Sequence, residues 1–291
     1  MTPFTPFVEH RIPSGQSGAQ IYTRDYAGHG PALVMMHGFP DNLGIYDALI
    51  PYLEIAGRRV IVFDFLGFGA SDKPADATYD FAQQRDDLER VVTYLDLGVV
   101  ELVAHDSSGI VAVDFALAHG DAVARLHMLN SAFDASPLAA WPEMIVVFGD
   151  PSLSALARHF AASPAQFGWL LEWQQGQFAA ALSPEHRDRF NATIGPLIAA
   201  NFITEPSAAP AFMQMASHFY AELARNSGRL EKVAMLDVPV TVIWGTGDPY
   251  LTTAMGEERA RRFRHGAFHP IDAGHWLQSD EPALVAKEIL S

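Results

Sequence analysis

The chain has 291 residues, 49% of them hydrophobic, which is enough to bury a large core in one compact unit carrying an insertion. Its formal net charge of −15 disfavours nucleic acid as a partner, because a polyanion is repelled by an acidic surface. The absence of cysteine excludes disulfides, thiol nucleophiles and thiolate metal sites.

The start of the chain and its hydropathy bear on location. The opening MTPFTPFVEHRIPSG lacks the basic segment and apolar run of a secretory signal. We find no unbroken apolar run long enough to span a bilayer. These features predict a cytoplasmic protein that does not bind membranes.

The predicted elements alternate between strands and helices. Residues 7–12 and 19–26 are expected to form a hairpin around the turn sequence SGQSG. Short apolar runs, typical of strands buried on both faces, follow at 32–38, 58–65, 100–105, 124–130, 238–245 and 266–272. Helical periodicity covers 43–56, 79–97, 107–119, 253–264 and 280–290. This alternation predicts an α/β fold with a mostly parallel eight-stranded sheet flanked by helices.

One long stretch departs from the alternation. Residues 131–236 are rich in Ala, Phe and Trp, have helical patterning and contain no convincing strand. We therefore expect a core domain made of 1–130 and 237–291, with 131–236 inserted as a helical cap, or lid, over the strand ends.

Polar and reactive side chains follow the apolar runs. The carboxyl ends of parallel strands meet at one edge of a sheet, so residues that follow different strands are expected to gather there. In chain order they are His37-Gly38-Phe39-Pro40, His105-Asp106-Ser107-Ser108-Gly109, Asn130-Ser131, Gly247-Asp248-Pro249 and Gly274-His275-Trp276.

This order of groups resembles the α/β-hydrolase family, whose members place nucleophile, acid and histidine on these loops. The resemblance runs from about residue 20 to the end, and it implies an α/β-hydrolase fold with a cap. The family's nucleophile lies on a strained turn that needs small residues two positions away on both sides. Asp106 has Ala104 and Ser108 there, whereas Ser107 would have the bulky His105. The pattern therefore favours Asp106 as nucleophile, although an aspartate here is also typical of a cap for helix 107–119.

The resemblance also implies the partners of Asp106. His275 is the expected base and Asp248 its orienting acid, since Asp272 lies inside the last strand-to-loop run and Asn130-Ser131 cannot ionise. Asp248 can alternatively be a simple turn acid in GTGDPY. The backbone N–H groups of Phe39 and Ser107 are expected to form the oxyanion hole. His37, His105 and Pro40 are expected to contact these catalytic groups and hold them in position.

An aspartate nucleophile displaces a leaving group from sp³ carbon, and the resulting ester is hydrolysed by water that the histidine activates. The chain thus resembles epoxide hydrolases, haloalkane dehalogenases and haloacetate dehalogenases. Epoxide hydrolases hold the epoxide oxygen with two cap tyrosines. Tyr220 is the candidate for one of them, and Trp169 stands where the other would be. A halide would have to be held by a cap tryptophan, namely Trp141, Trp169 or Trp173. Residues 107–110 lack the arginines of haloacetate dehalogenases.

We expect from the sequence an epoxide hydrolase that converts apolar epoxides to diols, with Tyr220, Trp169 and Trp173 at the substrate. Haloalkane dehalogenation is the main alternative, followed by haloacetate dehalogenation, a serine esterase using Ser107, and a non-catalytic ligand-binding protein of the same fold. The expected partners are a small apolar organic molecule and water, with no cofactor and no metal, in a monomer or homodimer.

Overall fold

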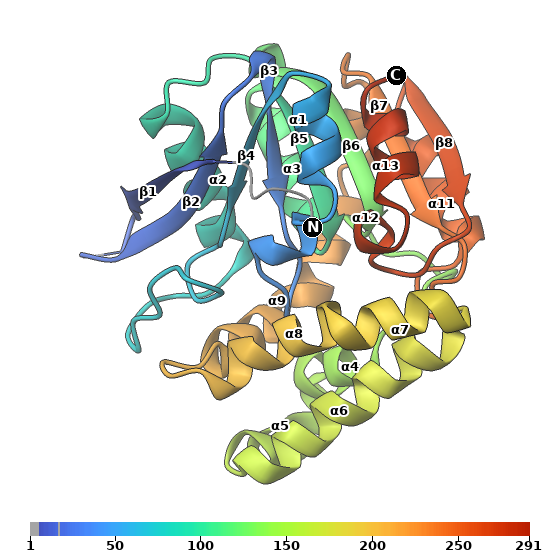
Figure 1. Cartoon of the computed structure of the whole chain (residues 1–291). Helices are drawn as coiled ribbons and strands as arrows, with labels where there is room; N and C mark the ends of the chain where they lie inside the picture. Colours follow the sequence, from blue (N-terminus) through green and yellow to red (C-terminus); the bar gives the residue numbers. More distant parts are fainter. Residues whose placement is uncertain (1–5, 17) are drawn as a thin grey trace.

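The computed structural model describes residues 6–16 and 18–291. At its centre lies an eight-stranded sheet with the spatial order β1-β2-β4-β3-β5-β6-β7-β8 (Figure 1). The strands are β1 (Val8–Pro13), β2 (Gln20–Tyr26), β3 (His29–Met36), β4 (Arg58–Phe63), β5 (Val100–Asp106), β6 (Val123–Ser131), β7 (Val240–Gly245) and β8 (Gly266–Ile271). The hairpin β1–β2 and the pair β2–β4 are antiparallel, and the remaining pairs are parallel. The predicted fold class is confirmed.

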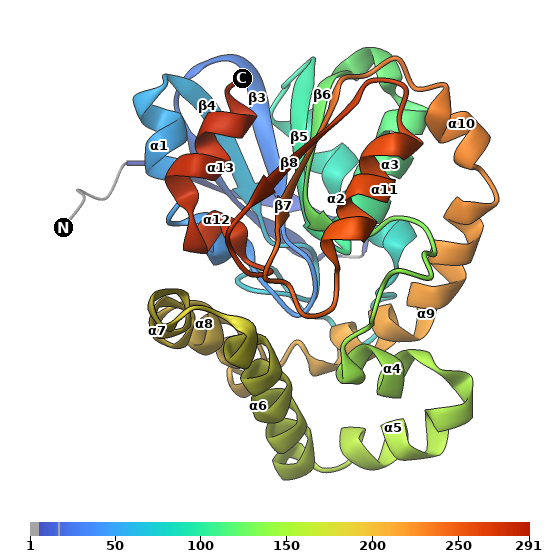
Figure 2. The same ribbon diagram turned by 90° about the vertical axis from the view of Figure 1, so that its right-hand side faces the viewer.

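Helices cover both faces of the sheet (Figures 1 and 2). On one face lie α1 (Ile50–Ile55), α12 (Leu277–Asp280) and α13 (Pro282–Ile289), and on the other lie α2 (Phe81–Tyr94), α3 (Ser108–Ala118) and α11 (Thr253–Arg262). The helix predicted over 43–56 is instead a 3₁₀ turn, η1 (Leu43–Tyr46), followed by α1. The helix predicted over 280–290 begins only at Pro282. Pro51 and Pro282 both stand in the first turn of their helices, where a residue without an N–H is tolerated.

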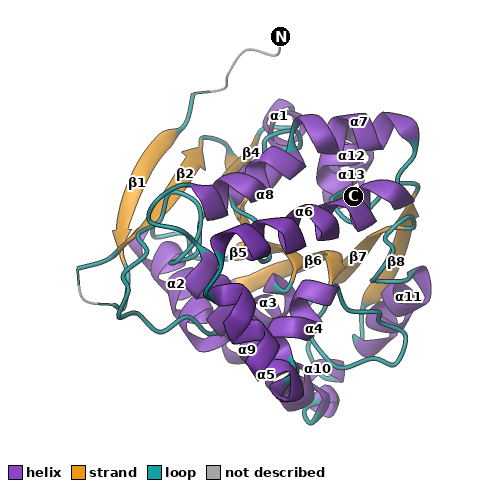
Figure 3. Ribbon diagram, turned by 90° about the horizontal axis from the view of Figure 1, so that it is seen from below, coloured by secondary structure: helices purple, strands orange, loops and turns teal. Residues whose placement is uncertain are grey.

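Every named element between β6 and β7 in the described part of the chain is helical. These are α4 (Glu143–Gly149), η3 (Pro151–Leu153), α5 (Ser154–Ala161), α6 (Pro164–Ala181), α7 (Pro184–Ala192), α8 (Ile194–Ile203), α9 (Ala209–Ser227) and α10 (Leu230–Ala234). Figures 2 and 3 show α4 to α9 gathered over one end of the sheet, and these helices are called the cap below. Among the helices described, none is both long and apolar enough to cross a membrane.

The central strands place the reactive loops. Residues 33–36 of β3 and 60–63 of β4 are completely buried. Each such side chain contributes about 1.5–3 kcal/mol by leaving water, so register slips in these strands are costly. The parallel strands β3, β5, β6, β7 and β8 therefore end at fixed positions along the edge that the cap covers.

One cap side chain anchors the cap to the loop after β3. The Nδ2 of Asn201, in α8, donates to the carbonyl oxygens of Pro40 and Asp41, at 2.6 and 2.9 Å. Its Oδ1 accepts from Asn42 Nδ2 and from the backbone N–H of Gly69, both at 3.2 Å. Because Asn201 is buried, these bonds hold the HGFP turn against the cap without competition from water.

A buried ion pair joins the start of the insertion to the core. Arg259 of α11 pairs with Asp134, and both side chains are fully buried. We expect Arg259→Leu to lower the free energy of unfolding by about 3–5 kcal/mol, because it leaves the Asp134 carboxylate buried without its main partner. Arg261→Leu, which breaks the exposed pair with Glu257, is the control and should shift stability by no more than about 0.5 kcal/mol. Urea unfolding measures both, and equal midpoints for the two variants would contradict the expectation.

Candidate active site

Asp106 lies on a sharp turn between β5 and α3. It is the last residue of β5 and has a φ of +54°, in the left-handed region that residues other than glycine rarely adopt. A Cβ on Gly109 would overlap the hydroxyl of Ser131, and one on Gly38 would overlap the Asp106 carboxylate. Positions 109 and 38 therefore require glycine, because a side chain there would collide with Ser131 or with the Asp106 carboxylate.

His275 lies between two carboxylates. Its Nδ1 is 2.6 Å from Asp248 Oδ2, and its Nε2 is 3.9 Å from Asp106 Oδ1. The three residues come from the ends of β8, β7 and β5, so the structure brings the predicted triad together. Asp272, the rival acid, is exposed. Nδ1 therefore bonds the orienting acid while Nε2 faces the nucleophile.

Asp248 combines the two roles that the sequence left open. Its Oδ1 accepts the backbone N–H groups of Tyr250 and Leu251 at 2.9 and 3.0 Å, as a turn acid does. Its Oδ2 accepts a hydrogen bond from His275 Nδ1. Burial opposes ionisation, but His275 and these hydrogen bonds outweigh it and hold the pKa of Asp248 below its usual value. The acid is therefore ionised and fixed in place.

Asn130 is a functional residue that sequence reasoning missed. Its Nδ2 donates to Asp248 Oδ2 at 2.8 Å, and its Oδ1 accepts the backbone N–H of Gly245 at 2.6 Å. From the sequence, Asn130 is not expected to act as the acid because its side chain cannot ionise, and the structure places it at the end of β6. Its amide ties the loop that carries Asp248 to β6, and its place at the end of a predicted central strand is the signal in the sequence.

The charges on the two carboxylates control the proton on His275. Burial favours neutral imidazole, but Asp248 and Asp106 outweigh it and raise the pKa of His275 to about 9. Burial likewise raises the pKa of Asp106, against the attraction of His275 and His105. At neutral pH His275 in the resting site is thus an imidazolium, which bonds the Asp248 carboxylate and faces Asp106.

We expect Asp106→Asn to lower the pKa of His275 from about 9, because the variant removes one of the two charges that stabilise the imidazolium. In a pH titration followed by NMR of the labelled imidazole, the protonated form should then be lost at lower pH than in the parent. Ser107→Ala removes no charge and should leave the titration unchanged. A His275 pKa that is the same in Asp106→Asn and in the parent would rule out this coupling.

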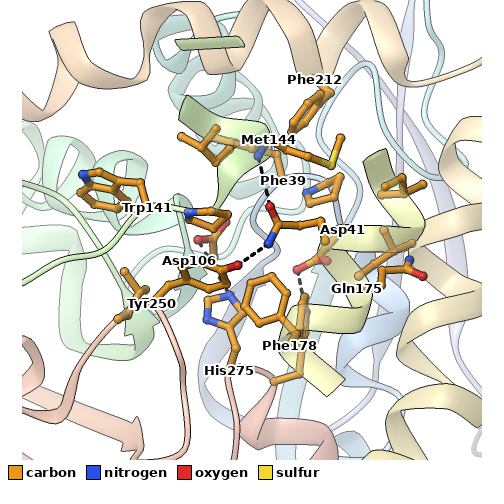
Figure 4. Close-up of a pocket in the computed structure, with 18 of the residues that line it drawn as sticks. Phe39, Asp41, Asp106, Trp141, Met144, Gln175, Phe178, Phe212, Tyr250 and His275 are labelled. Carbon is orange, nitrogen blue, oxygen red and sulfur yellow. Dashed lines mark hydrogen bonds and ion pairs between the residues drawn. The ribbon is translucent and has the colours of Figure 1, made fainter. Parts of the chain in front are cut away.

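A cavity lies between the sheet edge and the cap, and Asp106 and His275 open into it (Figure 4). The Asp106 side chain is 23% exposed. Ser107 is 1% exposed, does not line the cavity, and its Oγ has no hydrogen-bond partner among the described residues. The walls are mostly apolar and consist of Phe39, Pro40, Trp141, Pro142, Met144, Ile145, Leu171, Phe178, Ile198, Phe212, Phe219, Leu251 and Trp276, with Asp41, Gln174, Gln175 and Tyr250.

The residues expected to support the triad lie close to it. The backbone N–H of Ser107 interacts with the Asp106 carboxylate, and Phe39 and Pro40 line the cavity. His37 is buried, and its Nε2 accepts the backbone N–H of Phe65 at 3.1 Å. Burial lowers the pKa of His37, which keeps it neutral. His105 Nε2 donates to the carbonyl oxygen of His275 at 3.0 Å, so His105 helps to fix the loop that carries His275.

The three cap residues expected at the substrate lie elsewhere. Trp169 and Trp173 are 59% and 36% exposed, and neither lines the cavity. The face of α6 that does so carries Leu171, Gln174, Gln175 and Phe178, at the three- and four-residue spacing of a helix. That spacing was visible in the sequence, but which face of α6 turns inward was not.

Tyr220 is also outside the cavity lining. On α9 it is Phe212 and Phe219 that face the cavity, and Tyr220 stands one residue round the helix, edge-on to Trp141 at 6.4 Å between ring centroids. The phenol that does line the cavity is Tyr250. Its oxygen lies 2.7 Å from Glu143 Oε2, to which it donates, and it accepts from Gln174 Nε2 at 2.6 Å. Tyr220 and Trp169, the pair expected to hold an epoxide oxygen, therefore do not line the cavity.

Comparison with known proteins gives the family. The model of the α/β-hydrolase fold family matches residues 31–282, and the chain belongs to that family. Haloalkane dehalogenase 1 of Mycobacterium tuberculosis is 28% identical over 277 residues, covering 90% of this chain and 83% of the relative. Haloalkane dehalogenase of Mycobacterium marinum is 26% identical over 299 residues, covering 98% and 94%. The chain is thus a hydrolase with dehalogenase-like relatives.

Solved structures agree on the fold. A thermophilic esterase from Thermogutta terrifontis superposes with a TM-score of 0.75 at 23% identity, covering 97% of both chains. An esterase from Exiguobacterium antarcticum superposes with a TM-score of 0.76 at 22% identity, covering 97% of this chain and 98% of the other. At these identities the likeness concerns the fold alone.

Proposed function

We propose that this protein hydrolyses small neutral alkyl electrophiles through a covalent ester on Asp106. The main support for this proposal is that the turn after β5 exposes Asp106, and not Ser107, to the cavity. Asp106 opens into the cavity 3.9 Å from His275 Nε2, while Ser107 is buried beside it and outside the cavity. This geometry favours a carboxylate nucleophile over a serine esterase, and the complete triad favours an enzyme over a ligand-binding protein.

In the first step an Asp106 oxygen attacks the sp³ carbon of the substrate. The bond to the leaving group breaks, and that group departs with the bonding electron pair. The product is an ester between the Asp106 carboxyl and the substrate alkyl group. The two flanking carboxylates keep His275 protonated before this step, so the imidazole does not compete for the carbon.

Ester formation prepares the second step. It removes the negative charge of Asp106, so the pKa of His275 falls, the imidazolium releases its proton to solvent, and the neutral imidazole can act as a base. His275 takes a proton from water, and the hydroxide oxygen attacks the carbonyl carbon of the ester. The N–H groups of Phe39 and Ser107 stabilise the oxyanion. Collapse breaks the bond between carbonyl carbon and alkoxy oxygen, which takes up the proton from His275 and leaves as an alcohol, while Asp106 keeps one oxygen from water.

Halide is the leaving group that the comparisons favour, because two relatives that align with 90% and 98% of the chain are haloalkane dehalogenases. Trp141 is also the one of the three candidate tryptophans that lines the cavity. The structure weakens the epoxide expectation by leaving Tyr220 outside. Epoxide opening stays as the second candidate because Tyr250 brings a phenol to the cavity wall. No Lys or Arg is found among the lining residues described, which disfavours haloacetates.

Purified protein incubated separately with 1-bromobutane, styrene oxide and 4-nitrophenyl butyrate distinguishes these activities. We expect bromide release from 1-bromobutane, or, for the second candidate function, hydrolysis of styrene oxide to its diol, at a rate far above that of ester cleavage. Fast ester cleavage accompanied by fluorophosphonate labelling of Ser107 would instead identify a serine esterase. No turnover across the three classes would favour the ligand-binding alternative.

A further inference from the structure

The cavity holds a third carboxylate that the proposed reaction does not use. Asp41 follows the HGFP turn, lines the cavity and is 1% exposed. Its Oδ2 accepts the indole N–H of Trp276 at 3.0 Å and lies 3.5 Å from His105 Nδ1. Its Oδ1 is buried and has no hydrogen-bond partner among the described residues. A buried carboxylate oxygen without a donor is costly, so this atom is suited to receive one.

The position of Asp41 is fixed on both sides. Its backbone N–H bonds the carbonyl oxygen of Gly38 at 3.2 Å, and its own carbonyl oxygen accepts from Asn201 at 2.9 Å. Trp276 holds Oδ2, so the remaining freedom of the carboxylate is small. Figure 4 shows Asp41 with Asp106 and His275 among the residues that surround the cavity.

Other polar groups of the wall are already committed to the protein. Gln174 donates to Tyr250 and accepts the backbone N–H of Met144 at 3.1 Å, and Tyr250 donates to Glu143. Gln175 donates to the carbonyl oxygen of Gly195 at 3.1 Å. Oδ1 of Asp41 differs from these groups, because it is a buried acceptor with no donor among the described residues.

We infer that Asp41 selects substrates carrying a hydroxyl group, whose O–H donates to Oδ1 while the electrophilic carbon faces Asp106. This inference rests on the proposed function and names its substrate class as hydroxylated alkyl halides or epoxides. A hydroxyl is favoured over an ammonium because the phenylalanine-rich walls make the desolvation of a full charge expensive. Substrate carboxylates would be repelled.

Matched substrates test the selection in the unaltered protein. Each ω-bromoalkanol of three to six carbons is compared with the bromoalkane in which methyl replaces the hydroxyl, and glycidol is compared with 1,2-epoxybutane. At the best chain length we expect kcat/KM to be about 10- to 100-fold higher for the hydroxylated member, the usual effect of a hydrogen bond to a charged group. Equal values for every pair would overturn the inference.

Asp41→Asn is the matched variant. The indole N–H of Trp276 needs an acceptor, so the new amide turns its oxygen there and its NH₂ towards the cavity. The preference for the hydroxylated member should then fall to less than about threefold, as it should in Asp41→Leu. A uniform loss of rate with the preference intact would mean that Asp41 acts on a step common to all substrates, and the inference would be wrong.

Binding separates this inference from the proposed reaction. In Asp106→Ala, which cannot form the ester, 4-bromobutan-1-ol and its methyl isostere 1-bromopentane are titrated calorimetrically. The bromoalkanol should bind more tightly than the bromoalkane, and this difference should be lost in Asp106→Ala/Asp41→Asn. If the hydroxylated ligand binds more tightly but the parent protein turns over no alkyl halide or epoxide, the role of Asp41 is supported and the proposed function is rejected. If the parent protein turns over these substrates but shows no such binding preference, only the role of Asp41 is rejected.

Discussion

Asp106→Ala is expected to lower kcat/KM for 1-bromobutane by on the order of 10⁵-fold, because it removes the atom that forms the bond to carbon. Ser107→Ala is expected to stay within about threefold of the parent, since its backbone N–H is retained and its Oγ makes no hydrogen bond among the described residues. Initial rates of bromide release measure both variants. The pair is informative because the two residues are adjacent and both substitutions are truncations to alanine.

The opposite ranking would identify Ser107 as the nucleophile and remove the basis of the alkyl-ester mechanism. Single turnover in ¹⁸O-labelled water gives an independent result. Attack on the Asp106 carboxyl carbon leaves one labelled oxygen in the protein, whereas hydrolysis of a serine ester leaves none. Thermal unfolding of both variants shows whether a lost rate reflects lost folding.

His275→Gln is expected to trap the intermediate. The amide keeps the size of the side chain but cannot take a proton from water, so ester hydrolysis should slow by about 10³-fold or more while ester formation continues. Intact mass after mixing with 1-bromobutane should increase by one butyl group, and peptide mapping should place it on Asp106. Styrene oxide should add its full mass at the same residue if epoxides are substrates.

The double variant Asp106→Ala/His275→Gln is the control for this trap and should gain no mass. An adduct that persists in the double variant would come from alkylation elsewhere, for instance at another histidine. Rapid multiple turnover by His275→Gln would show that the base is a different group, and the role assigned to the contact with Asp248 would be lost.

Most of the scaffold was predictable from local pattern. The strands at 33–36 and 60–63 are continuous apolar runs because they are buried on both faces, and such runs are visible without a structure. Helix starts were predicted less well. Periodicity predicts single helices over 43–56 and 280–290, whereas α1 and α13 begin at Ile50 and Pro282, each with a proline in its first turn.

The cap shows where sequence reasoning stops. The sequence favours Trp169, Trp173 and Tyr220 at the substrate for their chemistry, yet the inward positions of α6 and α9 are occupied by Leu171, Phe178 and Phe219. Helical periodicity identifies which residues share a face, but the rotation of a helix about its axis is set by packing against the sheet edge. Neighbouring residues on a helix are about 100° apart, so Phe219 can line a cavity that Tyr220 does not reach.

The sequence by itself determined Asp106 as the candidate nucleophile, because the turn that bears it admits only small neighbours and that requirement is local. Chain order likewise identified Asp248 and His275, since each follows a buried strand whose end must lie at the same edge. Only the tertiary structure decided the surroundings of this triad. Three features depend on distances between segments far apart in the chain: the bond of Asn130 to Asp248, the bonds of Asn201 to the HGFP turn, and the Asp41 oxygen that has no partner among the described residues. Those distances arise only when sheet and cap have packed.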